Sequence, residues 1–210
     1  MVESNRNHST WGDGLGGAAA SAGDVNGDGY ADVIAGELGN SAAGLGAGRT
    51  FAFYGSASGP STGSGDWHDV TGFFGTGCGI SVASAGDVNG DGYGDVVIGC
   101  YDWSAVGAMN LYLGSALGLL AAPTWGSSGS GVVHSHYGWS VAPAGDVNGD
   151  GYGDVIVGEP DYTNGQLNEG RAYLYYGSST GVMTQAWVVE PDVANYELGT
   201  SVASAGDLNG

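Results

Sequence analysis

A segment rich in Asp, Asn and Gly occurs three times in this chain and constrains its fold more than any other feature. The full copies are GDVNGDGYADV at 23–33, GDVNGDGYGDV at 86–96 and the same sequence at 145–155, and a fourth copy begins as GDLNG at 206–210. The glycines that open the four copies are 63, 59 and 61 residues apart. Self-similarity at such a spacing predicts an array of similar structural units.

Each full copy places oxygen atoms where a calcium ion requires them. If the first Asp is position 1, side-chain oxygens stand at positions 1, 3, 5 and 9, and the Tyr at position 7 offers its backbone carbonyl, as position 7 does in an EF-hand loop. Glycine at position 6 permits a left-handed turn. Because the loop holds no thiolate or imidazole, zinc and copper are poor candidates. The predicted ligands are Asp24, Asn26, Asp28, Tyr30 and Asp32, then Asp87, Asn89, Asp91, Tyr93 and Asp95, then Asp146, Asn148, Asp150, Tyr152 and Asp154.

Two other interpretations of the loop are weaker. Asp, Asn and Gly all favour turns, so one copy alone would be ordinary turn chemistry. An EF-hand loop continues to a bidentate Glu at position 12 between two helices, whereas position 12 here is Ala35, Ile98 or Val157. Three copies with the ninth-position Asp in register therefore predict about three structural calcium ions.

The charge balance excludes some partners. The chain has 22 acidic and three basic residues, a net charge of −19, and ten of the acidic residues lie in the loop copies. With so few basic side chains, the chain could neither neutralise nucleic-acid phosphates nor be attracted to an anionic membrane surface. No apolar run approaches the length of a membrane span, so no membrane insertion is expected. The polar start MVESNRNHST lacks the apolar core of a signal peptide, which leaves a cytoplasmic chain or one whose true start is missing.

The residues around each loop predict strands. An alternating segment such as 81–85 precedes the loop, and a β-branched run such as 96–98 follows it. A third strand is expected at 50–56, 110–115 and 173–178, and a weaker fourth strand begins near Trp67, Trp125 and Ala186. Four strands per unit and no helical segment favour an all-β fold, a β-propeller of four-stranded antiparallel blades.

The units resemble FG-GAP repeats, the blades of the integrin α-chain head and of many bacterial secreted proteins. The FG counterparts are Leu15-Gly16, Cys78-Gly79, Tyr137-Gly138 and Leu198-Gly199, and the GAP counterparts begin at Gly36, Gly99 and Gly158. Phe is absent from every FG site and Ala-Pro from every GAP site, changes that affect packing and leave the metal loops intact. The resemblance implies that the calcium loop joins the innermost strand to the second strand and that loops on the opposite face bind ligand.

The resemblance also divides the chain into blades. Full blades are expected at 14–72, 77–130 and 136–190, with 1–10 as the outer strand of a preceding blade and 196–210 as the first strand of a truncated one. Closed propellers typically have four to eight blades. The chain is therefore interpreted as an open arc, a fragment of a longer propeller whose partners are the remaining blades of a longer chain or another copy.

The resulting functional hypothesis is a calcium-binding, integrin-like module without catalytic activity. It would be secreted or at the cell surface and would serve adhesion, with a protein or glycan ligand on the face opposite the calcium loops. The alternative is a non-catalytic accessory or carbohydrate-binding domain of a secreted hydrolase or lyase. The sequence leaves two points open, namely whether Cys78 and Cys100 are bonded and whether Trp11, Trp103 and Trp139 are sugar-stacking platforms. The pair His134 and His136 is interpreted as incidental surface histidine.

Overall fold

The computed structural model describes residues 14–38, 46–62, 65–69 and 76–206. Within these ranges the fold is all-β: three four-stranded antiparallel sheets in which strands consecutive in sequence pair with each other. The first sheet holds β1 (Gly14–Gly23), β2 (Asp32–Leu38), β3 (Arg49–Phe53) and β4 (Trp67–Asp69). The second holds β5 (Cys78–Gly86), β6 (Asp95–Cys100), β7 (Ala108–Tyr112) and β8 (Trp125–Ser127). The third holds β9 (Ser140–Gly145), β10 (Asp154–Glu159), β11 (Arg171–Tyr176) and β12 (Thr184–Val189).

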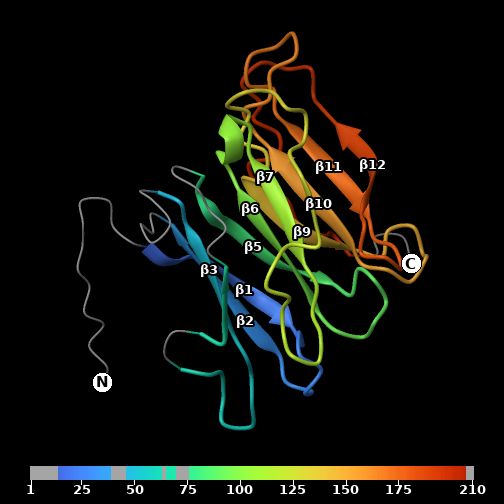
Figure 1. Ribbon diagram of the computed structural model, residues 1–210. Coiled ribbons are helices and arrows are strands. Elements are labelled where there is room, and N and C mark those ends of the chain that lie inside the picture. Colours follow the sequence, from blue (N-terminus) through green and yellow to red (C-terminus); the bar gives the residue numbers. More distant parts are fainter. Residues whose placement is uncertain (1–13, 39–45, 63–64, 70–75, 207–210) are drawn as a thin grey trace.

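The three sheets lie side by side in chain order (Figure 1). Their first strands are neighbours, because β1 packs against β5 and β5 packs against β9. Sheets that share an inner edge in this way are the blades of a partial β-propeller, so the predicted fold class is confirmed. We call the sheets blades 1, 2 and 3 below.

The hydrophobic core lies between neighbouring blades. One buried cluster joins blades 1 and 2 and includes Val25 and Leu119, and a second joins blades 2 and 3 and includes Val88 and Met183. The recurring tryptophans take part: Trp67 meets Tyr112 edge to face at 5.1 Å, and Trp125 meets Tyr175 in the same way at 5.3 Å. Blade packing therefore explains these two tryptophans.

Glycines at the GAP sites let the blades approach closely. A Cβ atom on Gly99 would lie 2.0 Å from the carbonyl oxygen of Gly138 in the next blade. Gly36 and Gly158 stand in the same relation to Gly79 and Gly199, at 2.0 and 1.9 Å. Since no side chain fits at such distances, glycine at this site is required by packing and carries no chemistry.

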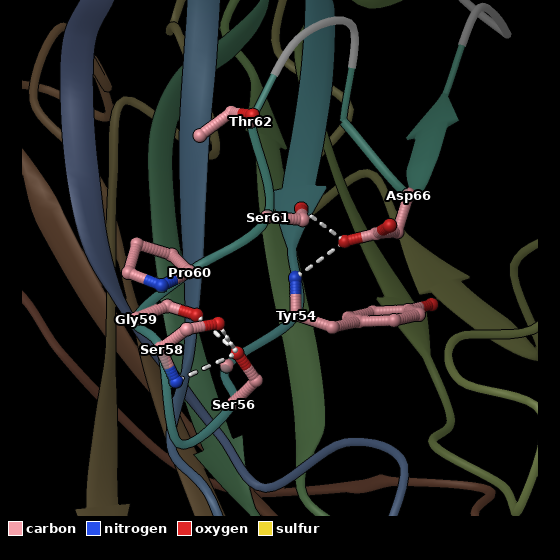
Figure 2. Close-up of a pocket in the computed structure, with 9 residues that line it drawn as sticks. Tyr54, Ser56, Ser58, Gly59, Pro60, Ser61, Thr62 and Asp66 are labelled. Atoms are coloured by element: carbon pink, nitrogen blue, oxygen red, sulfur yellow. Dashed lines mark hydrogen bonds between the residues drawn. The ribbon is translucent and has the colours of Figure 1, made fainter.

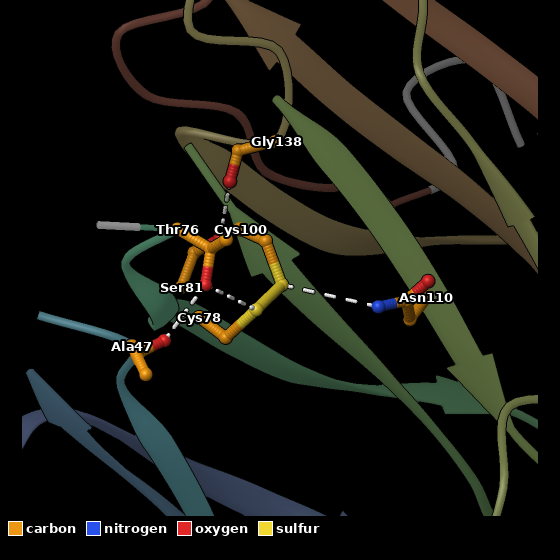
Figure 3. Close-up of a disulfide and its surroundings, with 7 residues drawn as sticks. All are labelled: Ala47, Thr76, Cys78, Ser81, Cys100, Asn110 and Gly138. Carbon is orange, nitrogen blue, oxygen red and sulfur yellow. Dashed lines mark hydrogen bonds between the residues drawn. A yellow bond between two sulfur atoms is a disulfide. The ribbon is translucent and has the colours of Figure 1, made fainter. Parts of the chain in front are cut away.

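Cys78 and Cys100 form a disulfide at the inner edge of blade 2 (Figure 3). An unbroken hairpin register would place Cys100 nearer residue 81, but a bulge between Cys78 and Ser81 brings the two cysteines opposite each other, and Gly79 adopts a φ of 83° within it. The bulge supplies the offset that the disulfide requires, because it inserts extra residues into one strand only. The disulfide joins the FG site of this blade to its GAP site. Both cysteines are almost fully buried and pack with Ala108.

The disulfide should contribute measurably to stability. Replacing both Cys78 and Cys100 with alanine is expected to lower the free energy of unfolding by about 3 kcal/mol, because the unfolded chain regains the freedom of the closed loop. Urea denaturation without reductant measures the difference. Reductant should destabilise the natural chain by a similar amount and leave the double variant unchanged. Equal stability of the two chains without reductant would contradict the prediction.

Candidate functional site

The three acidic loops lie at one end of the blades, each joining the first strand of its blade to the second. The position-6 glycines Gly29, Gly92 and Gly151 have φ values of 88°, 90° and 91°. These left-handed turns agree with the expectation from sequence, since other residues rarely adopt that conformation. The fourth copy, from residue 207 onward, lies outside the described residues.

Within each loop the side chains of positions 1, 3 and 5 accept hydrogen bonds from the backbone amides of the same loop. In blade 1, Asp28 N lies 3.0 Å from both Asp24 Oδ1 and Asn26 Oδ1, and Gly29 N donates to Asp24 Oδ2 at 2.8 Å. Tyr30 N donates to Asp28 Oδ1 at 2.9 Å. Blades 2 and 3 repeat this pattern, so the loops hold one shape in all three blades.

The aspartate at position 9 differs from the other loop carboxylates because it is buried. Asp32, Asp95 and Asp154 are 1%, 0% and 0% exposed. Asp95 accepts from Val88 N in its own loop at 2.8 Å and from Gly114 N, beyond β7, at 2.9 Å. Asp32 and Asp154 make the corresponding bonds. This aspartate therefore joins the loop to the turn after the third strand.

Burial of this aspartate removes its carboxylate from the water that would solvate a negative charge. Burial raises the pKa of Asp95 to about 7, the charges of Asp91 and Asp87 add to the rise, and the bonds from Gly114 and Val88 oppose it. The pKa values of Asp32 and Asp154 are raised for the same leading reason. The two arginines of the described ranges, Arg49 and Arg171, begin β3 and β11 at the other end of the blades. Within the described ranges the loops thus gather carboxylates without a lysine or arginine side chain beside them.

The donor set fits a hard cation by type, with carboxylate, amide and carbonyl oxygens in each loop. The side chains do not converge on a common point: among the described residues no three Asp, Glu, His or Cys side chains are grouped as ligands of one ion. Their oxygens accept from loop amides: Oδ1 of Asp87 and of Asp146 accepts two bonds, whereas Oδ2 of each accepts one and keeps a lone pair for a metal. The predicted metal residues therefore lie together in each loop without showing a closed coordination shell.

Neighbouring loops are linked to each other through the backbone. Gly94 N donates to the carbonyl oxygen of Asp24 at 2.7 Å, and Gly153 N donates to that of Asp87 at 2.8 Å. The peptide group that carries Gly94 N also carries the carbonyl of Tyr93, the predicted seventh-position ligand. The Tyr93 ring covers Gly27, where a Cβ would lie 2.7 Å from it. The first two loops are thus fixed against the blade that follows.

The third loop shows how contact with a following blade affects the burial of a loop. Val25 and Val88, at position 2 of the first two loops, are fully buried by the following blade, whereas Val147 is 54% exposed. In the same way, Gly149 has open space where Gly27 and Gly90 are covered by tyrosine rings. The contact with a following blade, rather than the loop sequence, therefore buries position 2.

A hollow of about 430 Å³ lies on the loop side of blade 1, around the turn from β3 to β4 (Figure 2). Asp66 Oδ2 accepts from Tyr54 N at 2.7 Å and from the hydroxyl of Ser61, and Ser56 Oγ donates to Gly59 O at 2.7 Å. The polar groups of this hollow already satisfy one another. It therefore offers no free set of groups that would define a site.

The end of the blades opposite the loops contains features that the sequence did not reveal. Glu159 and Ser135 are fully buried there. Glu159 accepts from Ser130 Oγ at 2.5 Å, from Ser135 Oγ at 2.6 Å and from the hydroxyl of Tyr173. This buried carboxylate holds the loop between β8 and β9 onto blade 3. No spacing in the sequence indicates it, because its three partners come from two separate segments.

The histidines and remaining tryptophans differ in their surroundings. His136 Nδ1 lies 2.5 Å from Asp161 Oδ2, so His136 is not an incidental surface residue, whereas the side chain of His134 is 71% exposed. Trp103 packs partly against the disulfide cluster, and Trp139 meets Tyr101 edge to face at 5.6 Å. Trp187 is 48% exposed, and Trp11 lies outside the described residues. None of the described residues forms a helix long and apolar enough to cross a membrane.

Comparison with known proteins agrees with the fold. The family described as FG-GAP repeat matches residues 16–51 and 137–175, which are parts of blades 1 and 3. The chain is 38% identical over 120 residues to integrin alpha pat-2 of Caenorhabditis elegans, a match that covers 50% of this chain and 10% of that protein. It is 31% identical over 149 residues to integrin alpha-7 of Rattus norvegicus, a match that covers 64% of this chain and 12% of that protein.

A shorter match concerns an enzyme. Over 50 residues the chain is 44% identical to the phosphatidylinositol-glycan-specific phospholipase D of Bos taurus, covering 23% of this chain and 6% of that protein. In these three relatives the chain spans about a tenth of the length or less. The matches therefore concern the repeats. The two family matches place FG-GAP repeats at residues 16–51 and 137–175, and the repeat region is similar to that of integrin α chains.

Proposed function

We propose that the chain is a calcium-stabilised propeller module for adhesion or ligand binding, without catalytic chemistry of its own. The observation that carries the proposal is the threefold loop, which carries three Asp and one Asn within nine residues and has neither lysine nor arginine in its sequence. Like charges at short range repel, and a bound cation would convert that repulsion into stability. The ions would be structural, one in each loop.

The exposed and the buried residues of each loop would have different roles in holding the ion. Positions 1, 3 and 5 are already turned by loop amides and would present their remaining lone pairs to the ion. Position 9 would connect the ion to the turn after the third strand, because its two oxygens accept from Val88 N and Gly114 N in blade 2. Calcium would supply charge neutralisation, and the chain would supply a rigid loop that loses little entropy on binding.

Calcium binding is tested by titration. Isothermal calorimetry on the natural chain should give about three sites, with dissociation constants of about 10⁻⁴–10⁻³ M as in extracellular modules. The variant carrying Asp28→Ala, Asp91→Ala and Asp150→Ala should lose this binding, and only the natural chain should melt at a lower temperature in chelator. Melting curves that coincide with and without calcium, or equal calcium binding by the variant, would refute the structural role.

Secretion or display at the cell surface and a ligand on the face opposite the loops belong to the same proposal. The similarity to integrin α chains supports them, and loops held on a rigid scaffold are where recognition usually occurs. Exchange of 101–107, 128–136 and 160–170 for glycine-serine segments of equal length should abolish ligand binding. Unchanged binding would exclude this face.

A second candidate is an accessory domain of a secreted hydrolase or lyase. The phospholipase D match favours it, because repeats of this kind occur there within an enzyme. A full-length protein in which these repeats are joined to a catalytic domain would identify the accessory role. Activity of that enzyme with and without residues 14–206 measures what the repeats contribute.

A further inference from the structure

A cluster of aromatic and imidazole rings lies at the blade end opposite the acidic loops. Tyr101 follows β6, while His136 and Trp139 precede β9, so the cluster spans the junction of blades 2 and 3. The ring centroids are 5.5 Å apart for Tyr101 and His136, 5.6 Å for Tyr101 and Trp139, and 6.0 Å for His136 and Trp139. All three side chains are partly exposed. We call these three residues, with Asp161, the ring cluster.

The polar groups of the ring cluster form a matched pair. His136 Nδ1 lies 2.5 Å from Asp161 Oδ2, and the two side chains are 27% and 33% exposed. The pair leaves an imidazole nitrogen, Nε2, and a carboxylate oxygen, Oδ1, for other partners. Because Nδ1–H of a neutral imidazole donates to Asp161, Nε2 is an acceptor, so the pair offers two hydrogen-bond acceptors next to aromatic rings.

The backbone holds these groups rigidly. Ser135 is fully buried, with its Oγ 2.6 Å from Glu159 Oε1, and its carbonyl accepts from Asp161 N at 3.2 Å. The residues on either side, His134 and His136, have φ values of 61° and 57°. Left-handed backbone at residues other than glycine costs energy and persists where the surrounding structure enforces it, often at ligand sites.

The same strain marks the whole end of the blades. Eight described residues other than glycine have positive φ, and all lie in loops at this end: Ser104, Ala105, His134, His136, Asn168, Asp192, Asn195 and Glu197. At the acidic loops, positive φ falls on glycines alone. The loops that carry the ring cluster are thus the ones in which the chain accepts strained backbone.

From these observations we infer that the ring cluster is a subsite for a neutral carbohydrate. An aromatic face packs against the apolar face of a sugar ring, while sugar hydroxyls donate to the free carboxylate oxygen and to the imidazole Nε2. A cationic ligand would have to displace His136 from Asp161. An anionic ligand would approach Asp161 and Asp102 on a chain of net charge −19. This inference rests on the ligand-binding part of the proposed function and names the class of ligand.

The test uses the whole chain in calcium-containing buffer. A printed array of neutral, amino and acidic glycans selects the sugars, and saturation-transfer NMR with the selected monosaccharide identifies the bound protons. Trp139→Ala and Asp161→Asn should weaken binding by about tenfold or more, since each removes a principal contact. Trp187→Ala is the matched control, because Trp187 is exposed on β12, away from the cluster, and should bind as the natural chain does. Melting curves verify that each variant is folded.

The outcomes separate the two proposals. Neutral glycans that bind the natural chain and the Trp187 variant, and bind the Trp139 and Asp161 variants weakly, support the subsite. Absence of glycan binding, preference for acidic glycans, or equal loss in the Trp187 variant overturns it. A chain that binds calcium and no glycan keeps the structural-calcium proposal, and a chain that binds glycan and no calcium loses that proposal alone.

Discussion

Replacing Asp95 with alanine should lower the free energy of unfolding by about 2–4 kcal/mol even in chelator. The reason is that Val88 N and Gly114 N lose their acceptor inside the protein, and a buried donor without a partner costs about 1–3 kcal/mol. Part of the loss is offset because the buried charge also disappears. Chemical denaturation at neutral pH measures the net effect.

Asp91→Ala is the matched control for that experiment. Asp91 belongs to the same loop, but its oxygens accept from exposed groups, namely Tyr93 N and the side chain of Asn89. Its removal in chelator should change stability by less than about 1 kcal/mol, as is usual for a surface residue. In calcium both variants should lose the contribution of the bound ion. If Asp95→Ala unfolds like the natural chain in chelator, the ninth aspartate has no structural role beyond the metal.

Replacing Gly99 with alanine should destabilise the chain by about 3 kcal/mol or more, at the upper end for overpacking. The added Cβ would lie 2.0 Å from the carbonyl of Gly138 and 2.2 Å from Ser81 Oγ. A carbonyl in the backbone of the next blade cannot turn away as a side chain can. Blades 2 and 3 would have to separate along their inner edge, exposing the cluster that contains Val88 and Met183.

Gly126→Ala provides the comparison for Gly99→Ala. Gly126 lies on the short outer strand β8, and the nearest atom to an added Cβ is the side-chain oxygen of Asn110, at 2.8 Å. That side chain can rotate, and the backbone carbonyl of Met109, 3.0 Å from the added Cβ, needs only a small shift, so the loss of stability should be about 1–2 kcal/mol. Thermal melts and the yield of soluble chain distinguish the two variants. Similar behaviour of both would mean that the blades tolerate a wider spacing.

The sequence predicts the blade design well because its signals are local. Each loop ends in an Asp followed by a β-branched run, and these residues form the loop and second strand in all three blades. The fourth strand could be placed only through its tryptophan, since β4 and β8 are three residues long. Local patterns therefore sufficed for the strands and for the order of pairing.

Features that depend on a bulge or on distant segments could not be predicted in this way. The position of Cys78 opposite Cys100 depends on a bulge that hydrophobic alternation does not show. The pairing of His136 with Asp161 joins residues 25 apart on two different loops. Nothing in either segment alone indicates the other, so His136 was wrongly interpreted as incidental.

The peptide between Tyr93 and Gly94 gives the row of loops a direction. Its amide meets the carbonyl of Asp24 in the preceding loop, and the peptide between Tyr152 and Gly153 meets that of Asp87 in the same sense. The first two loops therefore offer a carbonyl acceptor to the loop that follows in the chain. The second and third loops offer an amide donor to the loop that precedes them. A distortion of the second loop acts on both neighbouring blades, because Gly94 N is bonded to the preceding loop and the Asp87 carbonyl to the following one. In an array where each unit touches only its neighbours, loosening would then spread from the distorted loop in both directions, one blade at a time.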